Sequence, residues 1–213
     1  MKVRSATVGP FQENSYLVID EEQRRAVLID PGAEPERLIA MVRDSGATLD
    51  AIWLTHGHVD HIGGIAGVRR EWAVPVYMHQ SDLPLYERGA EQAAEYGVPF
   101  EVPDAPDEVI VGGDTLVVGG LRFEVVHTPG HSPGHVLFRR DDTVLGGDLL
   151  FAGAIGRTDL EGSDPERMEE SLARLCELDD RTVVYPGHGP ATSIGRERAT
   201  NPFLIGLVPT VGR

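Results

Sequence analysis

Residues 51–64 read AIWLTHGHVDHIGG, an apolar run followed at once by side chains that can bind a metal ion. The run 51–54 has the length and composition of a buried strand. Four candidate ligands come directly after it: His56, His58, Asp60 and His61. Imidazole and carboxylate groups are good ligands for zinc or iron, and a strand that gives way to a loop can point neighbouring side chains into one cavity. A histidine-rich surface loop is the alternative interpretation of the same letters.

Three further candidate ligands follow apolar runs later in the chain. They are His131 in TPGHSPGH, Asp148 in LGGDLLF and His188 in YPGHGP, each a few residues past a predicted strand. Taken singly, each would more often be a structural loop residue. Because residues at the strand ends along one sheet edge can converge on a single cleft, we expect these three side chains to join the first four in one metal site.

The rest of the chain alternates blocks of strands with single helices. The ranges predicted as strands are 2–8, 15–20, 26–30, 51–54, 74–78, 115–118, 121–127, 135–139, 143–145 and 182–185, and the main predicted helices are 35–45 and 165–175. Residues 81–106 show helical fragments and a Pro-rich acidic loop, which we interpret as a surface insertion near the pocket. Each half of the chain runs through strands first and then a helix and a strand. This layout suits an α/β architecture of two sheets packed face to face with helices outside, although the pattern alone does not select it.

The composition excludes several classes of function. The 213 residues, which we interpret as one domain over 1–213, include 19 Lys and Arg against 34 Asp and Glu, a formal net charge of -15. Nucleic acids and anionic membranes attract clustered basic residues, so both are disfavoured as partners. The lone Cys176 cannot form an intrachain disulfide. No run approaches the roughly 18 apolar residues of a membrane span and no signal peptide is visible, so we expect a cytoplasmic protein.

The motifs together resemble a known family. HGHVDH, TPGHSPGH, GGD and PGHG resemble the metallo-β-lactamase fold superfamily over about residues 50–190. The phrases GHSPGH, GDLLFAGAIGRTDL and YPGHGPATSIGRERATNPF are most similar to its glyoxalase II-like, or hydroxyacylglutathione hydrolase-like, branch, in a short form without the C-terminal helical domain. The resemblance implies a four-layer αββα sandwich. It also implies that His56, His58 and His131 hold one metal ion, that Asp60, His61 and His188 hold the other, and that Asp148 bridges the two.

The same resemblance implies hydrolysis of the thioester of S-acyl thiols such as S-lactoylglutathione. Two divalent metal ions, zinc in the first place with iron or manganese as alternatives, can share a bridging hydroxide that attacks the acyl carbon. Asp60 and Asp148 would be the catalytic carboxylates, and Asp60 could also orient the hydroxide. Arg157 would bind a substrate carboxylate, with an ion pair to Asp159 as the structural alternative. Only about 25 residues follow His188, which leaves the thiol carrier open.

Other functions fit parts of the pattern. A persulfide dioxygenase-like oxidoreductase with one iron is similar around GRTD and is the main alternative. A β-lactamase is less favoured, because no export signal is visible and Asp148 stands where several such enzymes have Cys. A nuclease would be expected to carry a basic surface, and a binding module without activity would be expected to lack the metal. We expect a small-molecule thioester substrate as the partner, with no nucleic acid, no membrane and no obligate protein partner.

Several chemically tempting residues are better explained by structure. His79, His127 and His135 fall outside the ligand pattern, so we expect them to have structural or supporting roles. Cys176 falls on the apolar side of a predicted helix and is expected to be a core residue.

Overall fold

In the computed structural model, which describes residues 1–205 and residue 207, the first six strands form one mixed sheet. In spatial order they are β1 (Lys2–Val8), β2 (Glu13–Asp20), β3 (Arg25–Ile29), β4 (Thr48–Trp53), β5 (Val76–His79) and β6 (Glu108–Ile110). The pairs β1–β2 and β2–β3 are antiparallel, whereas the remaining pairs are parallel. Parallel neighbours require crossover connections, and helices supply them here. The end of the domain predicted over 1–213, residue 206 and residues 208–213, lies outside the described residues.

The second sheet also has six strands. In spatial order they are β14 (Thr192–Ser193), β13 (Val183–Pro186), β10 (Thr143–Gly147), β9 (Val136–Arg140), β8 (Leu121–His127) and β7 (Thr115–Val118). Only β10 and β13 pair in parallel. A small hairpin of β11 (Leu150–Phe151) and β12 (Ala154–Ile155) lies between β10 and the helix that leads to β13.

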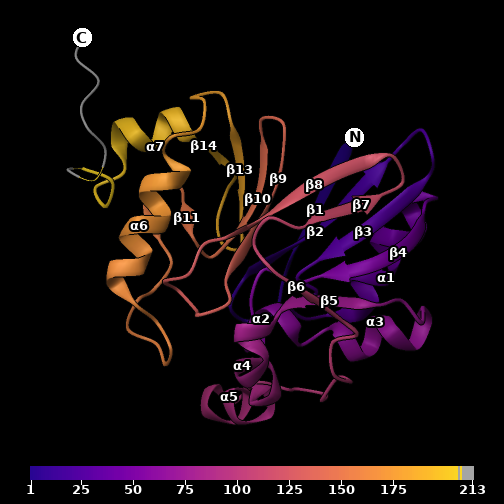
Figure 1. The fold of residues 1–213 in the computed structure, drawn as a ribbon. Coiled ribbons are helices and arrows are strands. Elements are labelled where there is room, and N and C mark those ends of the chain that lie inside the picture. The colour runs from indigo at the N-terminus through magenta and orange to yellow at the C-terminus, as the bar shows by residue number, and fades with distance from the viewer. Residues whose placement is uncertain (206, 208–213) are drawn as a thin grey trace.

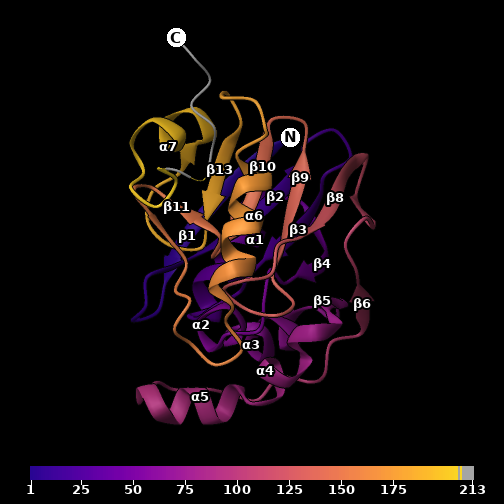
Figure 2. The same ribbon diagram turned by 60° about the vertical axis from the view of Figure 1, so that its left-hand side comes forward.

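Helices cover the outer faces of both sheets. On the first sheet they are α1 (Pro35–Ser45), α2 (Val59–Ile62) and α3 (Ile65–Glu71), and on the second they are α6 (Pro165–Leu175) and α7 (Ile194–Thr200). Figure 1 shows α1 and α3 on one side of the molecule and α6 and α7 on the other, with the strands between them. The turned view in Figure 2 shows α5 (Gly89–Tyr96) at the lower end, next to α4 (Leu83–Glu87). The predicted αββα sandwich is therefore confirmed.

Strand periodicity sorts side chains between two apolar layers. Along β2 and β3, Leu17 and Leu28 join the cluster beneath α1 and α3, whereas Val18 and Val27 join the cluster between the two sheets. Successive side chains of a strand point to opposite faces, so a strand covered on both faces is buried throughout. All eight residues of β2 are buried for this reason. A third cluster joins the outer face of the second sheet to α6 and α7.

Trp53 is the largest side chain between the two sheets. It is 2% exposed and packs edge-on against Phe123, with ring centroids 5.6 Å apart, and tilted against Phe138 at 5.3 Å. We expect Trp53→Ala to lower the free energy of unfolding by about 3 to 5 kcal/mol, because a cavity would open between the sheets. Chemical denaturation followed by far-UV circular dichroism measures the change. Val117→Ala, on an edge strand with the Val117 side chain half exposed, is the control and should cost less than about 0.5 kcal/mol. A Trp53 variant as stable as that control would contradict the packing described here.

The segment 81–106 lies at the surface and lines the cavity over the ligands, as expected, although Asp82, at the end of the short helix η1 (Gln80–Asp82), is fully buried. The acidic loop of this segment leads into the edge strand β6, which was not predicted and has only three residues. Elements of two or three residues, such as β6, β11 and β14, are too short to show a hydrophobic period. In the part of the chain that the structure describes, no helix is both long and apolar enough to cross a membrane.

Candidate metal centre

All seven predicted ligands lie at one end of the sandwich. Four follow the end of β4, and the others follow the ends of β8, β10 and β13: His56, His58, Asp60 and His61, then His131, Asp148 and His188. The strands β8, β10 and β13 run in the same direction, because β9 is antiparallel to both β8 and β10 and β10 is parallel to β13. Their carboxyl ends therefore share one edge of the second sheet, and β4 delivers its four side chains there from the first sheet.

Three histidines form a first group. Ring nitrogens of His56, His58 and His131 all lie within 4.8 Å of one another, and all three side chains are buried. His58 Nδ1 lies 2.9 Å from His131 Nε2. Two unprotonated ring nitrogens at that separation repel each other unless a proton or a cation lies between them. The group offers neutral nitrogen ligands of the kind that zinc and iron accept.

Asp60, His61 and His188 form a second group with ligand atoms within 4.8 Å of one another. Asp148 lies between the two groups. Its Oδ1 is 3.4 Å from His61 Nε2, and its Oδ2 is 3.5 Å from His188 Nε2 and 3.6 Å from His131 Nε2. One carboxylate thus faces both groups, which is the position that a bridging ligand requires. Together the clusters are consistent with a binuclear metal site.

Asp30 also lies within reach of His56 and His61, but its oxygens are already used. They accept hydrogen bonds from the Thr55 backbone N–H at 2.8 Å and from the Thr55 hydroxyl at 2.6 Å. Because that hydroxyl gives its proton to Asp30, its oxygen accepts from His56 Nδ1, 3.0 Å away. Asp30 Oδ2 also accepts from His61 Nδ1 at 3.0 Å. Both imidazoles therefore carry the proton on Nδ1 and present an unprotonated Nε2 to the site.

Backbone carbonyls determine which ring nitrogen carries the proton in two further histidines. His131 Nδ1 donates to the Arg157 carbonyl at 2.8 Å, and His188 Nδ1 donates to the Phe11 carbonyl at 3.1 Å. A carbonyl can only accept, so the proton of each ring lies on Nδ1. In both rings Nε2 is therefore the nitrogen that can bind a cation.

Buried polar atoms at this site fit a metal better than they fit an apolar core. Among the described residues, His56 Nε2, His61 Nε2 and Asp148 Oδ1 are buried and have no hydrogen-bond partner. A buried polar atom without a partner costs about 1 to 3 kcal/mol, and a charged one costs more. A divalent cation would satisfy all three atoms at once. The residues present therefore fit a pair of metal ions.

The electrostatics keep His56 and His58 neutral and the central carboxylate charged, whereas Asp148 and Asp60 outweigh burial and raise the pKa of His61. Burial, with the His131 imidazole next in effect, lowers the pKa of His58 to about 3. Burial by itself would raise the pKa of Asp148, but the neighbouring His61 and the other imidazoles outweigh it and hold that pKa below its usual range. Neutral imidazole and charged carboxylate are the forms that bind metals.

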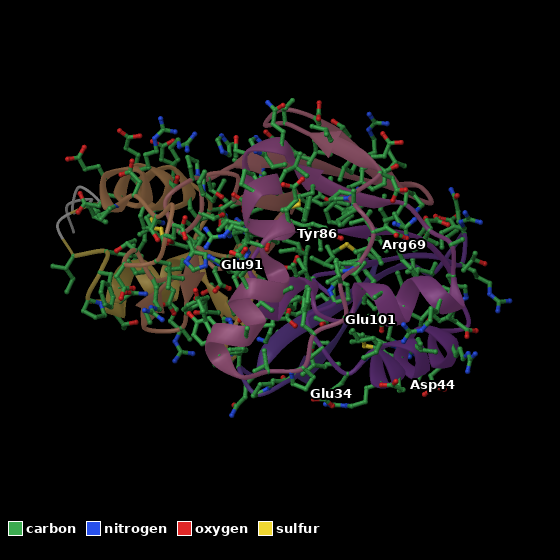
Figure 3. All side chains as sticks on the ribbon, turned by 90° about the horizontal axis from the view of Figure 1, so that it is seen from below. Glu34, Asp44, Arg69, Tyr86, Glu91 and Glu101 are labelled. Carbon is green, nitrogen blue, oxygen red and sulfur yellow. The ribbon has the colours of Figure 1, made fainter. Side chains whose placement is uncertain are left out.

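A cavity of about 280 Å³ opens over the site. Its lining joins the ligands to apolar side chains such as Phe11, Leu85 and Phe151, and to Arg157. Arg157 is exposed and forms two hydrogen bonds with Asp159, at 2.8 and 2.9 Å, so the structural alternative for this side chain is present. Figure 3 shows α4 and α5, with Glu91, lying across the seam between the half that carries α6 and the half that carries α1 and α3. These two helices form a wall of the cavity.

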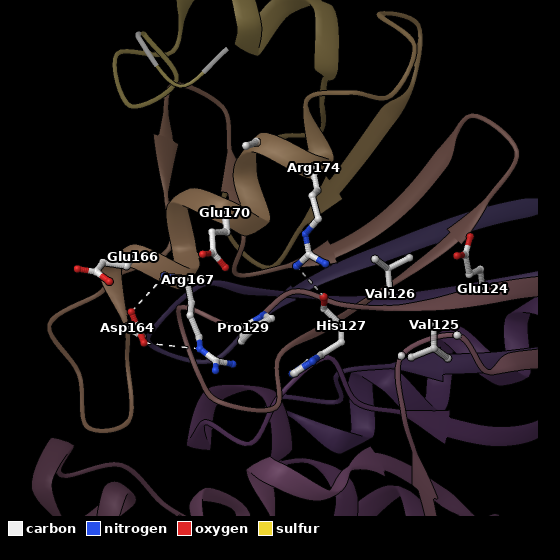
Figure 4. A pocket seen from close by; sticks show the side chains of 13 residues that line it. Glu124, Val125, Val126, His127, Pro129, Asp164, Glu166, Arg167, Glu170 and Arg174 are labelled. Atoms are coloured by element: carbon white, nitrogen blue, oxygen red, sulfur yellow. Dashed lines mark hydrogen bonds and ion pairs between the residues drawn. The ribbon is translucent and has the colours of Figure 1, made fainter. Parts of the chain in front are cut away.

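A larger groove than this cavity lies elsewhere among the described residues. It measures about 950 Å³ and runs between α6 and β8, with His127, Arg167 and Arg174 among its lining residues (Figure 4). Its lining contains acidic and basic side chains but none of the seven predicted ligands. Size therefore does not identify the functional site here, whereas the convergence of ligand side chains does.

Other histidines and the cysteine have the supporting roles expected of them. His135 Nε2 accepts a hydrogen bond from the Asp148 backbone N–H at 3.0 Å, and its Nδ1 donates to Thr128. His79 and His127 stack on each other, with ring centroids 4.3 Å apart. Cys176 is 1% exposed at the end of α6 and belongs to the core.

Sequence reasoning missed Gly187, which allows the backbone after β13 to pass close to Asp148 and His61. A Cβ atom on Gly187 would lie 2.1 Å from Asp148 Oδ1 and 2.8 Å from His61 Cε1. Any other residue would push the central carboxylate out of place. The glycine before the last histidine in PGHG was a possible signal, because glycine allows a backbone to approach closely.

A family model described as Metallo-beta-lactamase superfamily matches residues 8–188, a span that contains all seven predicted ligands. "Probable metallo-hydrolase YqgX" of Bacillus subtilis (strain 168) is 40% identical over 211 residues, which are 97% of this chain and 99% of that protein. "Hydroxyacylglutathione hydrolase GloC" of Haemophilus influenzae is 37% identical over 209 residues, which are 96% of this chain and 98% of that protein.

Solved structures extend the likeness to three dimensions. One described as BLEG-1 B3 metallo-beta-lactamase superposes with a TM-score of 0.90 at 37% identity and covers 96% of this chain and 100% of its own. Another, TTHA1623 in a di-iron-bound form, superposes with a TM-score of 0.88 at 46% identity and covers 94% of this chain and 100% of its own.

Proposed function

The chain belongs to the metallo-beta-lactamase superfamily as a metal-dependent hydrolase, and from that premise we propose that it hydrolyses the thioester bond of S-acyl thiols such as S-lactoylglutathione. The observation that carries the proposal is the pair of ligand groups that share Asp148 beneath an open cavity. The likeness to a hydroxyacylglutathione hydrolase along nearly the full length of both chains supports the thioester class.

In the proposed site, two sets of three residues would hold two metal ions. His56, His58 and His131 would hold one ion, Asp60, His61 and His188 would hold the other, and Asp148 would be shared between the two sets. Such a pair of ions supplies a nucleophilic hydroxide at neutral pH and polarises the acyl carbonyl. We propose zinc as the metal, with iron or manganese as alternatives. The di-iron form of TTHA1623 supports keeping iron among them.

The chain's own residues orient the reacting groups. Asp60 lies on the cavity side of the second group, where its second oxygen can accept a proton from the nucleophile and fix its direction. Phe11 and Phe151 are apolar parts of the cavity lining and limit the access of water to the acyl carbon, and the Phe151 ring packs edge-on against the His188 imidazole. Arg157 can leave Asp159 to pair with a substrate carboxylate, because both side chains are exposed and such surface pairs are weak.

The direct test follows the loss of the thioester absorbance of S-D-lactoylglutathione with purified protein whose metal content has been measured. We expect rapid hydrolysis that disappears in His58→Ala. A protein with two bound metals and no thioester turnover would refute the proposed substrate class while leaving the metal site in place.

Two other reactions are measured in the same experiment. Hydrolysis of a chromogenic cephalosporin tests β-lactam cleavage, which is included because the chain is similar to the BLEG-1 structure. Oxygen uptake with glutathione persulfide, together with one iron per chain, would indicate the dioxygenase alternative. Thioester turnover that exceeds both, with two metals per chain, is the result we expect.

Arg157 is expected to act on substrate binding more than on the chemical step. Arg157→Ala should raise KM for S-D-lactoylglutathione about tenfold with little change in kcat, because a charge-assisted hydrogen bond contributes about 1.5 kcal/mol or more to binding. Only the side chain is lost, so the backbone carbonyl that orients His131 remains. Arg181→Ala is the matched control, because Arg181 pairs with Asp179 at 2.9 Å in the same way but does not line the cavity. Equal KM values for the two variants would remove Arg157 from the substrate site.

A further inference from the structure

Asp82 is a fully buried carboxylate in a part of the chain to which no role has been assigned so far. It ends the short helix η1 after β5, and its exposed fraction is 0%. Burying a carboxylate is expensive unless hydrogen bonds or cations compensate for the lost water. Within the described residues, no arginine or lysine forms an ion pair with it, so hydrogen bonds must compensate for the lost water.

All the donors to Asp82 come from the two loops that carry the first ligand group. Its Oδ2 accepts a hydrogen bond from the Gly57 backbone N–H at 3.0 Å and another from the Ser132 hydroxyl at 2.6 Å. Its Oδ1 accepts a hydrogen bond from the Gly134 backbone N–H. Gly57 stands between His56 and His58, and Ser132 follows His131 directly. One side chain therefore ties the two loops together next to all three imidazoles of the group.

The fit around Asp82 is close. A Cβ atom on Gly134 would lie 2.7 Å from the Asp82 backbone nitrogen and 2.8 Å from its Oδ1, so the chain can pass here only as glycine. Ser132 and Gly134 in TPGHSPGH are thereby explained by their contacts with Asp82. The serine donates to Asp82, and the glycine both donates and makes room.

The charge of Asp82 complements the group above it. His56, His58 and His131 are neutral ligands, so the group has no carboxylate other than the shared Asp148. A negative charge held directly behind these loops attracts a divalent cation in the group, although Asp82 itself forms hydrogen bonds to the loops and not to the imidazoles.

We propose that Asp82 is a positioning residue that holds the His56–His58 loop against the His131 loop and thereby sets the metal affinity of this group of three. The inference rests on the proposed function only in that these imidazoles bind a metal ion. It does not depend on which substrate is cleaved.

The test compares Asp82→Asn with Asp20→Asn. The Asp20 side chain is 5% exposed and also accepts hydrogen bonds from backbone N–H groups of two loops, Glu22 and Gln23 on one side and Gly120 on the other. It lies at the far end of β2 from Glu13, which pairs with His188, so about 20 Å separate it from the site. Asparagine keeps the shape of either side chain but places an NH2 group against at least one N–H donor.

Metal affinity is the main readout, measured by competition with a chromophoric chelator, and metal content is measured by mass spectrometry. We expect Asp82→Asn to lower the affinity for one of the two metals about 10- to 100-fold and to leave the affinity for the other unchanged. Asp20→Asn should retain both metals at the wild-type affinity, although both variants lose stability. Ser132→Ala removes only one of the hydrogen bonds and should weaken the same metal by a smaller factor, which keeps the test valid if Asp82→Asn does not fold.

Each outcome decides the matter. If Asp82→Asn and Ser132→Ala bind both metals as tightly as the Asp20→Asn control, or if the wild-type protein binds no metal, the proposal is overturned. If one metal is selectively weakened but the wild-type protein hydrolyses no thioester, the role of Asp82 stands and the proposed substrate class fails.

Discussion

Replacing Asp148 by alanine is expected to lower kcat/KM for thioester hydrolysis by at least about a thousandfold. Asp148 faces both ligand groups, with its oxygens 3.4 to 3.6 Å from imidazole nitrogens of His61, His188 and His131. Without it, the paired ions that would lower the pKa of a bound water toward neutrality are no longer held together, and each pKa unit of that lowering corresponds to about 1.4 kcal/mol. Steady-state kinetics with S-D-lactoylglutathione measure the effect, together with the metal content of the variant.

The control for this experiment is the same substitution at an exposed carboxylate. Asp44 lies on α1, and Figure 3 shows it at the edge of the molecule. Asp44→Ala should retain full activity and two metals. Asp148→Asn is a second variant of closely similar shape, and we expect it to lose as much activity as alanine because an amide nitrogen does not bind a cation. An Asp148 variant that keeps wild-type turnover and metal content would show that the reaction does not use the paired groups.

The sequence was most informative where chemistry and periodicity coincide. The apolar run 51–54 predicted a strand, and β4 ends at Trp53, so the candidate ligands that follow it lie at a strand end as expected. The same reasoning placed His131, Asp148 and His188 after strands, and the structure brings them to the same edge. Side chains that follow strand ends can be located from sequence because strand direction and sheet order restrict where they meet.

What the sequence could not predict is how each imidazole is oriented. Two of the groups that orient the rings are the backbone carbonyls of Phe11 and Arg157. Every residue has such a carbonyl, so the residue type does not indicate this role. The Asp30 and Asp82 side chains are visible in the sequence, but a single aspartate after a strand is usually a turn residue. Their roles depend on contacts with residues 25 and 50 positions away in the chain, which no local pattern encodes.

Removal of both metals by a chelator is expected to abolish activity and to lower the melting temperature by roughly 15 to 30 °C. Ligands that bind only the folded state at a thousand times their dissociation constant stabilise it by about 4 kcal/mol per site, and a protein of this size loses about 2 to 4 °C per kcal/mol. The physical reason lies in His56 Nε2, His61 Nε2 and Asp148 Oδ1, which are buried and have no hydrogen-bond partner among the described residues.

Differential scanning fluorimetry with and without the chelator measures the shift, and added zinc should restore both the melting temperature and the activity. Trp53→Ala is a matched control, because its lower starting stability comes from the core and the shift on chelation should be retained. Asp148→Ala should show a smaller shift than the wild-type protein, because it binds metal weakly from the outset. If the chelator removed both metals without lowering the melting temperature, the three buried atoms would have other partners. The argument that this site fits two cations would then be wrong, even if the protein were an active thioesterase.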